Sequence, residues 1–165
     1  MLPIRLTAAL LLSLVLAGPA AAQGDDKVKT DRHALYYYPE TTSAETYVAR
    51  ARTLDDASRE KRIGFVVAHT LGQAQRPYPP RYALYAKGDE AEKLLLIGLY
   101  DETFLTLYRA RAVLAQMTAL ARSSDLFRTL AVEDYFTFFD LLKMLGFRQI
   151  TISDGDTYTH QVTIE

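Results

Sequence analysis

Residues 93–100 have the sequence KLLLIGLY, and this stretch decides the fold that we predict for the chain. Side chains along a strand alternate between the two faces of a sheet, so both faces of this segment are apolar. Such a segment is typical of a strand in a sheet that is covered on both sides. Its two apolar rows are Leu95, Ile97 and Leu99 on one face and Leu94, Leu96 and Tyr100 on the other.

Two segments before it also favour strands. Ile63–Thr70 and Tyr82–Lys87 are rich in β-branched and aromatic residues, which pack well in sheets. A Pro-rich loop, Gln73–Pro80, separates them, and a tight turn at Gly88–Glu90 joins the second to residues 93–100. We therefore expect three strands here, of which the first, like the last, is apolar on both faces.

Helical periodicity follows this run of strands. Apolar residues recur at intervals of three and four between Thr103 and Arg122, which predicts an amphipathic helix. A second helix is predicted from Glu133 to Leu145, because acidic residues stand at its N-terminal end and Gly146 follows its C-terminal end.

The chain ends in a predicted hairpin. Ile150 and Ile152 are apolar positions of one strand, and Tyr158, Val162 and Ile164 are those of the other. A three-residue loop with Gly155 in the left-handed conformation places both groups on one face, whereas a two-residue loop places them on opposite faces. We therefore expect the three-residue loop.

Together these segments predict an α+β domain, with a largely antiparallel sheet of about five strands in the order βββααββ and two helices packed on one face. The other face then needs a cover, because monomers rarely leave large apolar patches exposed. That cover is either the chain's own Tyr-rich segment at residues 36–38 or a partner, and we favour the chain itself. Residues 35–165 are expected to form this single domain.

Residues 1–22 predict a cleavable secretory signal peptide. Arg5 precedes an apolar run, and the small residues Ala20–Ala22 end it, with cleavage expected between Ala22 and Gln23. The apolar run is shorter than the ~20 residues of a membrane span, so we expect no transmembrane segment after processing. The absence of a twin-arginine pair favours Sec-type export, and the mature protein is expected to be periplasmic or secreted.

Composition limits how the mature chain is stabilised and what it binds. The chain has no Cys, so its stability must come from a hydrophobic core rather than from disulfides. Without Arg5 it has 18 basic and 20 acidic residues, a balance that argues against nucleic-acid binding by bulk charge. Residues 23–34 are polar and aperiodic, which is typical of a flexible leader.

Tyrosine indicates a candidate binding surface. The chain has 11 Tyr and no Trp, and Tyr is enriched at interfaces because it is large and amphipathic. Several of them fall in the N-terminal segment or close to the Pro-rich loop, where they would suit a protein partner or a small ligand. They are Tyr36, Tyr37, Tyr38, Tyr78, Tyr82 and Tyr85.

Three polar residues form a candidate cluster near the strand ends. His69 and His160 share the parity of apolar strand positions, and Arg148 lies just before the hairpin. No His-x-His, HExxH or Cys pair accompanies them, so we predict neither a metal site nor a bound cofactor. Asp140, among the Phe residues of the second predicted helix, is expected to be exposed and to pair with Lys143.

Three stretches, YYYPE (36–40), EDYFTFFDLLKMLGF (133–147) and ITISDGDTYTHQ (150–161), resemble a group of short exported bacterial proteins of unknown activity. Some members carry the name molybdopterin-guanine dinucleotide biosynthesis protein A, which implies a GTP-dependent nucleotidyltransferase. The characteristic motif of that enzyme class is an N-terminal strand followed by a Gly-rich loop with Arg and Lys, and this sequence does not contain that loop. The resemblance therefore implies a small exported protein.

No catalytic sequence pattern is found in the chain, neither a GxSxG elbow nor a phosphate-binding Gly-rich loop. We therefore predict a non-enzymatic binding or accessory domain. The alternatives are an enzyme whose site lies near His69, His160 and Arg148, and the activity that the inherited family name implies.

Overall fold

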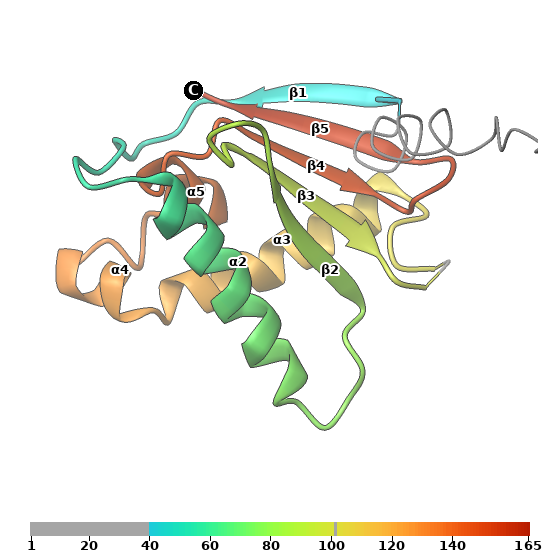
Figure 1. The fold of residues 1–165 in the computed structure, drawn as a ribbon, viewed down its shortest axis with the longest axis horizontal. Coiled ribbons are helices and arrows are strands. Elements are labelled where there is room, and N and C mark those ends of the chain that lie inside the picture. Colours follow the sequence, from blue (N-terminus) through green and yellow to red (C-terminus); the bar gives the residue numbers. More distant parts are fainter. Residues whose placement is uncertain (1–39, 101) are drawn as a thin grey trace, which may run out of the picture.

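The computed structural model describes residues 40–100 and 102–165, which form a five-stranded sheet with four helices on one of its faces (Figure 1). The predicted signal peptide, the leader and Tyr36–Tyr38 lie outside the described residues. No helix in the described part is long and apolar enough to cross a membrane. The elements in chain order are β1 (Ser43–Tyr47), α2 (Arg59–Ala74), β2 (Tyr82–Lys87), β3 (Lys93–Gly98), α3 (Leu107–Arg122), α4 (Asp125–Leu130), α5 (Phe138–Met144), β4 (Gln149–Ser153) and β5 (Thr159–Ile164).

The sheet is mixed, with the strand order β1-β5-β4-β3-β2. β1 runs parallel to β5 and β3 parallel to β4, while the other two pairs are antiparallel. The predicted α+β class is confirmed, but the largely antiparallel sheet and the order βββααββ are wrong. The reason for the β3–β4 pairing lies in the connection, because three helices carry the chain back along the sheet, and β4 then starts at the same end as β3.

The predicted strand at 63–70 is part of helix α2. Its β-branched residues favour a strand by local propensity, but tertiary contacts override that preference. The helix begins after Ser58, whose side chain accepts a hydrogen bond from the Lys61 N–H at 3.3 Å. Phe65 packs on the rings of Phe138 and Phe147, with centroids 6.3 and 6.0 Å away. These contacts attach one side of α2 to the core.

The two predicted helices are both present, with different lengths. α3 covers most of the predicted 103–122 segment, whereas the predicted 133–145 helix is shortened to α5. Thr137 caps the N-terminal end of α5, and its backbone N–H donates to Asp140 Oδ2 at 2.8 Å. Gly146 follows the C-terminal end of the helix in the left-handed conformation, with φ +83°, which confirms its predicted position there.

Asp140 is fully buried, so the prediction of an exposed carboxylate is wrong. Its Oδ1 atom accepts hydrogen bonds from the backbone N–H groups of Arg50 at 2.7 Å and Ala51 at 3.2 Å. Its Oδ2 atom accepts one from the Tyr47 hydroxyl at 3.1 Å. The carboxylate therefore ties the segment after β1 to α5 instead of pairing with Lys143.

The hydrophobic core lies between the sheet and the helices. Ile150 pairs with Val162 and Ile152 with His160, so the predicted same-face register of the hairpin is confirmed. The apolar side chains on this face of the sheet pack against those of the helices and loops. The largest fully buried aromatic and aliphatic side chains of this core are Phe104, Phe127, Phe147, Leu94, Leu96, Leu142, Ile150, Ile152 and Val162.

The opposite face of the sheet is apolar at β2 and β3 and becomes polar toward β5. One row across it joins Tyr85, Leu95, Thr151 and Gln161. No helix of the described part lies on this face (Figure 1). The Tyr-rich segment that we expect there lies outside the described residues, and its place on this face remains a prediction.

Candidate functional site

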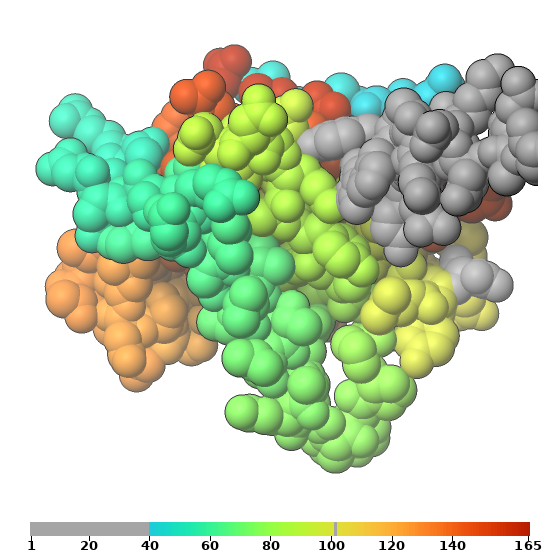
Figure 2. All heavy atoms as spheres, in the orientation of Figure 1, coloured from blue at the N-terminus to red at the C-terminus, as the bar shows by residue number. Residues whose placement is uncertain are grey.

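A groove runs between helices α2 and α3. The two helices lie on the same face of the sheet, but α2 packs on β2 whereas α3 packs on α5. The C-terminal end of α2 and the Pro-rich loop after it project from the body of the molecule (Figures 1 and 2). Three cavities with shared lining residues follow one another along the space between the helices, and we call them together the α2–α3 groove.

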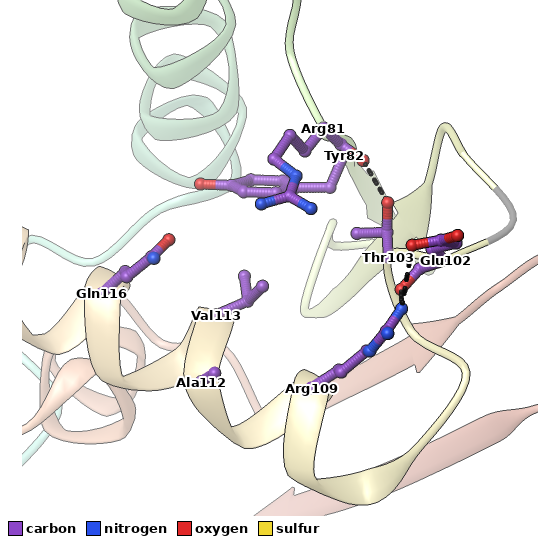
Figure 3. Close-up of a pocket in the computed structure, with 8 residues that line it drawn as sticks. All are labelled: Arg81, Tyr82, Glu102, Thr103, Arg109, Ala112, Val113 and Gln116. Carbon is purple, nitrogen blue, oxygen red and sulfur yellow. Dashed lines mark hydrogen bonds and ion pairs between the residues drawn. The ribbon is translucent and has the colours of Figure 1, made fainter.

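The first cavity has a volume of about 320 Å³ and lies where α3 begins. Arg81 and Tyr82 face Val113 and Gln116 of α3 across it (Figure 3). Its other lining residues are Glu102, Thr103, Arg109 and Ala112. Most of this surface is polar, so this end of the groove suits a polar or charged group.

The second cavity, of about 490 Å³, continues from the first. The two share Arg81, Tyr82 and Gln116. Its walls are mostly apolar, with the Pro-rich loop on one side and α3 on the other. The remaining lining residues are Gln73, Arg76, Tyr78, Pro79, Pro80, Ala119 and Leu120.

The third cavity is smaller, about 170 Å³, and closes the apolar end of the groove. It shares Leu120 with the second cavity, and Leu120 is 45% exposed although it is a large aliphatic side chain. Phe65, Met117 and Leu141 contribute apolar walls, and His69 is one of its few polar residues. An exposed leucine between two apolar hollows is a surface that a ligand would cover favourably.

His69 and Tyr82 form a hydrogen-bonded pair inside the groove. His69 Nε2 lies 3.2 Å from the Tyr82 hydroxyl, and the Gln73 amide donates to the Tyr82 carbonyl at 3.3 Å. Burial lowers the pKa of His69, and the nearby charge of Arg76 lowers it further. Burial also raises the pKa of Tyr82. Both shifts favour the uncharged form of the side chain, so this pair adds no charge to the groove at neutral pH.

The charge of the groove comes from arginines. Arg109 Nη1 lies 3.6 Å from the Glu102 carboxylate, and this ion pair neutralises the positive charge of Arg109. The side chains of Arg76 and Arg81 have no ion pair or hydrogen bond within residues 40–100 and 102–165. The groove therefore carries two positive charges without a counterion in the described part of the chain.

The structure divides the predicted tyrosine surface. Tyr78 and Tyr82 line the same cavity of the groove. Tyr85 lies on the opposite face of the sheet, where Lys87 Nζ is 5.5 Å from its ring centroid. The predicted members Tyr36–Tyr38 lie outside the described residues. The groove thus contains two of the tyrosines that the sequence singled out.

The structure does not bring His69, His160 and Arg148 together. His69 belongs to α2, whereas His160 lies on β5, where its Nδ1 is 2.8 Å from the Ser43 hydroxyl and its Nε2 is 3.2 Å from Glu45. Arg148 lines a separate, highly charged cavity of about 600 Å³ that also contains the buried Arg62. The three residues thus occupy three different environments.

Sequence reasoning missed most of the groove. Arg76 lies within the Pro-rich loop at residues 73–80 and Arg81 directly follows it, so their position at this loop was an available signal. Gln116 and Leu120 lie on α3, and nothing in their local sequence distinguishes them from other exposed helix residues. In the described part of the chain no three acidic or histidine side chains gather in a way that could hold a metal ion.

Comparison of the chain with protein-family models, with curated proteins and with solved structures gives no significant match.

Proposed function

We propose that the protein is an exported, non-enzymatic binding domain that holds a small ligand in the α2–α3 groove. The observation that carries this proposal is the continuous series of cavities between the two helices, lined by Tyr82, Arg81 and Leu120. The volume of the central cavity, about 490 Å³, falls within the roughly 300–1,000 Å³ of small-molecule sites. The predicted signal peptide supports export.

The lining also resembles that of a binding site in its chemistry. Ligand sites combine apolar walls with a few convergent polar groups. Here Pro79, Pro80 and Leu120 supply apolar surface, while Gln73 and Tyr82 supply buried polar groups. An enzyme acting through His69, His160 and Arg148 has less support, because these residues lie in separate environments.

The test compares two leucines of equal exposure. Leu120 lies in the groove and is 45% exposed, whereas Leu130 of α4 is 46% exposed and lines none of the three cavities. The protein is purified gently from cells that export it, and its mass is measured by native and by denaturing mass spectrometry. We expect an additional mass that is lost on denaturation, that Leu120→Arg removes and that Leu130→Arg leaves in place.

Two results would contradict the proposal. The first is a bound mass that persists in Leu120→Arg, which would place the ligand elsewhere. The second is a bare monomer that also fails to bind apolar fluorescent probes in solution, which would leave the groove without a ligand-binding role. Circular dichroism of each variant checks that the fold is retained.

A further inference from the structure

The chemistry of the α2–α3 groove changes from one end to the other. Arg81 places a positive charge at the end near the start of α3, and Arg76 places a second one in the central cavity beside the Pro-rich loop. Met117, Leu120 and Leu141 make the other end apolar. A ligand that follows the groove therefore meets positive charge at one end and hydrocarbon at the other.

Arg81 is available to a ligand. Its backbone carbonyl is already used, since it accepts hydrogen bonds from the Leu99 N–H and the Thr103 hydroxyl, and this fixes the backbone at the mouth of the cavity. Its guanidinium group has no ion pair or hydrogen bond within the described residues and lies over the cavity beside Tyr82 (Figure 3). A guanidinium group offers several N–H donors in one plane, which suits an anionic group with two or three oxygens.

Arg76 strengthens the preference for negative charge. Its positive charge adds to the effect of burial in lowering the pKa of His69 and partly opposes the rise that burial causes in the pKa of Tyr82, so this charge acts across the middle of the groove. Glu102 is the acidic residue among the lining residues of the three cavities, and its carboxylate is paired with Arg109. The net field therefore favours an anion.

The apolar walls require that the rest of the ligand be hydrophobic. The ring of Tyr82 and the side chains of Pro80 and Leu120 line the central cavity. An uncharged hydrocarbon or aromatic body placed there would cover Leu120 and displace water from the apolar walls. A small inorganic anion would leave these walls in contact with water.

From this gradient we infer that the ligand is a small amphipathic organic acid, with its anionic group at Arg81 and its apolar body between Tyr82 and Leu120. The inference rests on the proposed function and deepens it. It concerns one class of small molecule, and it does not require that the acid be aromatic or aliphatic.

The test uses two fluorescent probes that differ by one charged group. 1-Anilinonaphthalene-8-sulfonate is an amphipathic anion, and N-phenyl-1-naphthylamine has the same aromatic body without the sulfonate. Binding of each is titrated with the purified full chain, with Arg81→Gln and with Arg59→Gln. Arg59 is an exposed arginine at the opposite end of α2 with no ion pair in the described part of the chain, so it is a matched control.

We expect the anionic probe to bind about tenfold more tightly than the neutral one, the typical gain from one charge-assisted hydrogen bond at a partly exposed site. Arg81→Gln should remove most of this difference by weakening only the anionic probe, and Arg59→Gln should change neither affinity. Dodecanoate should displace the anionic probe, whereas inorganic phosphate should not.

The other outcomes separate the two proposals. Equal binding of both probes that is unaffected by Arg81→Gln overturns the organic-acid inference but leaves a binding groove. Displacement by inorganic phosphate also overturns it, because the site then recognises a simple anion. If neither probe binds the chain, the inference fails together with the proposed function.

Discussion

Replacement of Asp140 by Asn gives the sharpest test of how this fold is held together. The change keeps the shape of the side chain but replaces one carboxylate oxygen with an NH2 group. Asp140 is fully buried and accepts hydrogen bonds from three backbone N–H groups, those of Arg50, Ala51 and Thr137. Because an NH2 group cannot accept these bonds, at least one buried donor is left without a partner.

The size of the effect follows from which oxygen is lost. If the amide oxygen of the introduced asparagine occupies the Oδ1 position, it still accepts the hydrogen bonds from the backbone N–H groups of Arg50 and Ala51. The Thr137 N–H then loses its acceptor. An unsatisfied buried donor costs about 1–3 kcal/mol, and the remaining bonds lose the added strength of a charged acceptor. We therefore expect Asp140→Asn to lower the free energy of unfolding by roughly 2–4 kcal/mol. Asp140→Ala, which removes both oxygens, should lower it further.

The effect should depend on pH in a defined direction. Burial acts to raise the pKa of Asp140, but the hydrogen bonds from Thr137, Arg50 and Ala51 outweigh it and hold the pKa below its usual value. A lowered pKa in the folded state stabilises the protein above the unfolded-state pKa of about 3.9, and this stabilisation is lost as the pH falls through the folded-state pKa. The difference in the free energy of unfolding between the wild type and Asp140→Asn should therefore become smaller at acidic pH.

Urea unfolding followed by circular dichroism, at neutral pH and near pH 3, measures both effects. Asp55→Asn is the control, because Asp55 is exposed and its carboxylate has no hydrogen bond within residues 40–100 and 102–165; it should change stability by less than about 0.5 kcal/mol. Two results would refute the role given to this carboxylate. One is that Asp140→Asn lowers the free energy of unfolding by less than about 1 kcal/mol. The other is that the difference in this free energy between wild type and variant does not change with pH.

Two further substitutions test the packing. Gly146→Ala should destabilise the fold more than Gly155→Ala. Both glycines have positive φ, so each substitution should cost about 1–2 kcal/mol in backbone strain. A Cβ at position 146 would in addition lie 2.7 Å from Arg62 Nη1, whereas the nearest atom to a Cβ at position 155 is 3.9 Å away. Equal losses in urea unfolding would contradict this. Leu142→Ala should cost about 2–5 kcal/mol because Leu142 is fully buried, and Leu130→Ala, at a 46% exposed position, should cost far less. Similar melting temperatures for the two leucine variants would show that the core is not where we place it.

Several features of the fold could be predicted from the sequence because they depend on neighbouring residues. The apolar run at 93–100 predicts strand β3, and the helical period of 103–122 predicts α3. Gly146 marks the end of α5, and the parity of Ile150 and Val162 sets the register of the hairpin. In each case the information lies within a few residues of the element itself.

Other features depend on segments that are far apart in the chain. The β-branched segment at 63–70 forms a helix because Phe65 meets Phe138 and Phe147, which no local pattern contains. Asp140 is buried because the backbone at residues 50 and 51 needs an acceptor. The parallel pairing of β3 and β4 results from the path of the helices between them.

The α2–α3 groove likewise combines features set by neighbouring residues with features set by segments far apart in the chain. The Pro-rich loop, with Tyr78 in it and Tyr82 just after it, could be identified from the sequence. That Gln116 and Leu120 of α3 lie opposite these tyrosines and complete a cavity depends on the tertiary structure. The physical reason is that α2 and α3 each bury one face on different partners, so the space between them depends on the position of both helices on the sheet and not on either sequence alone.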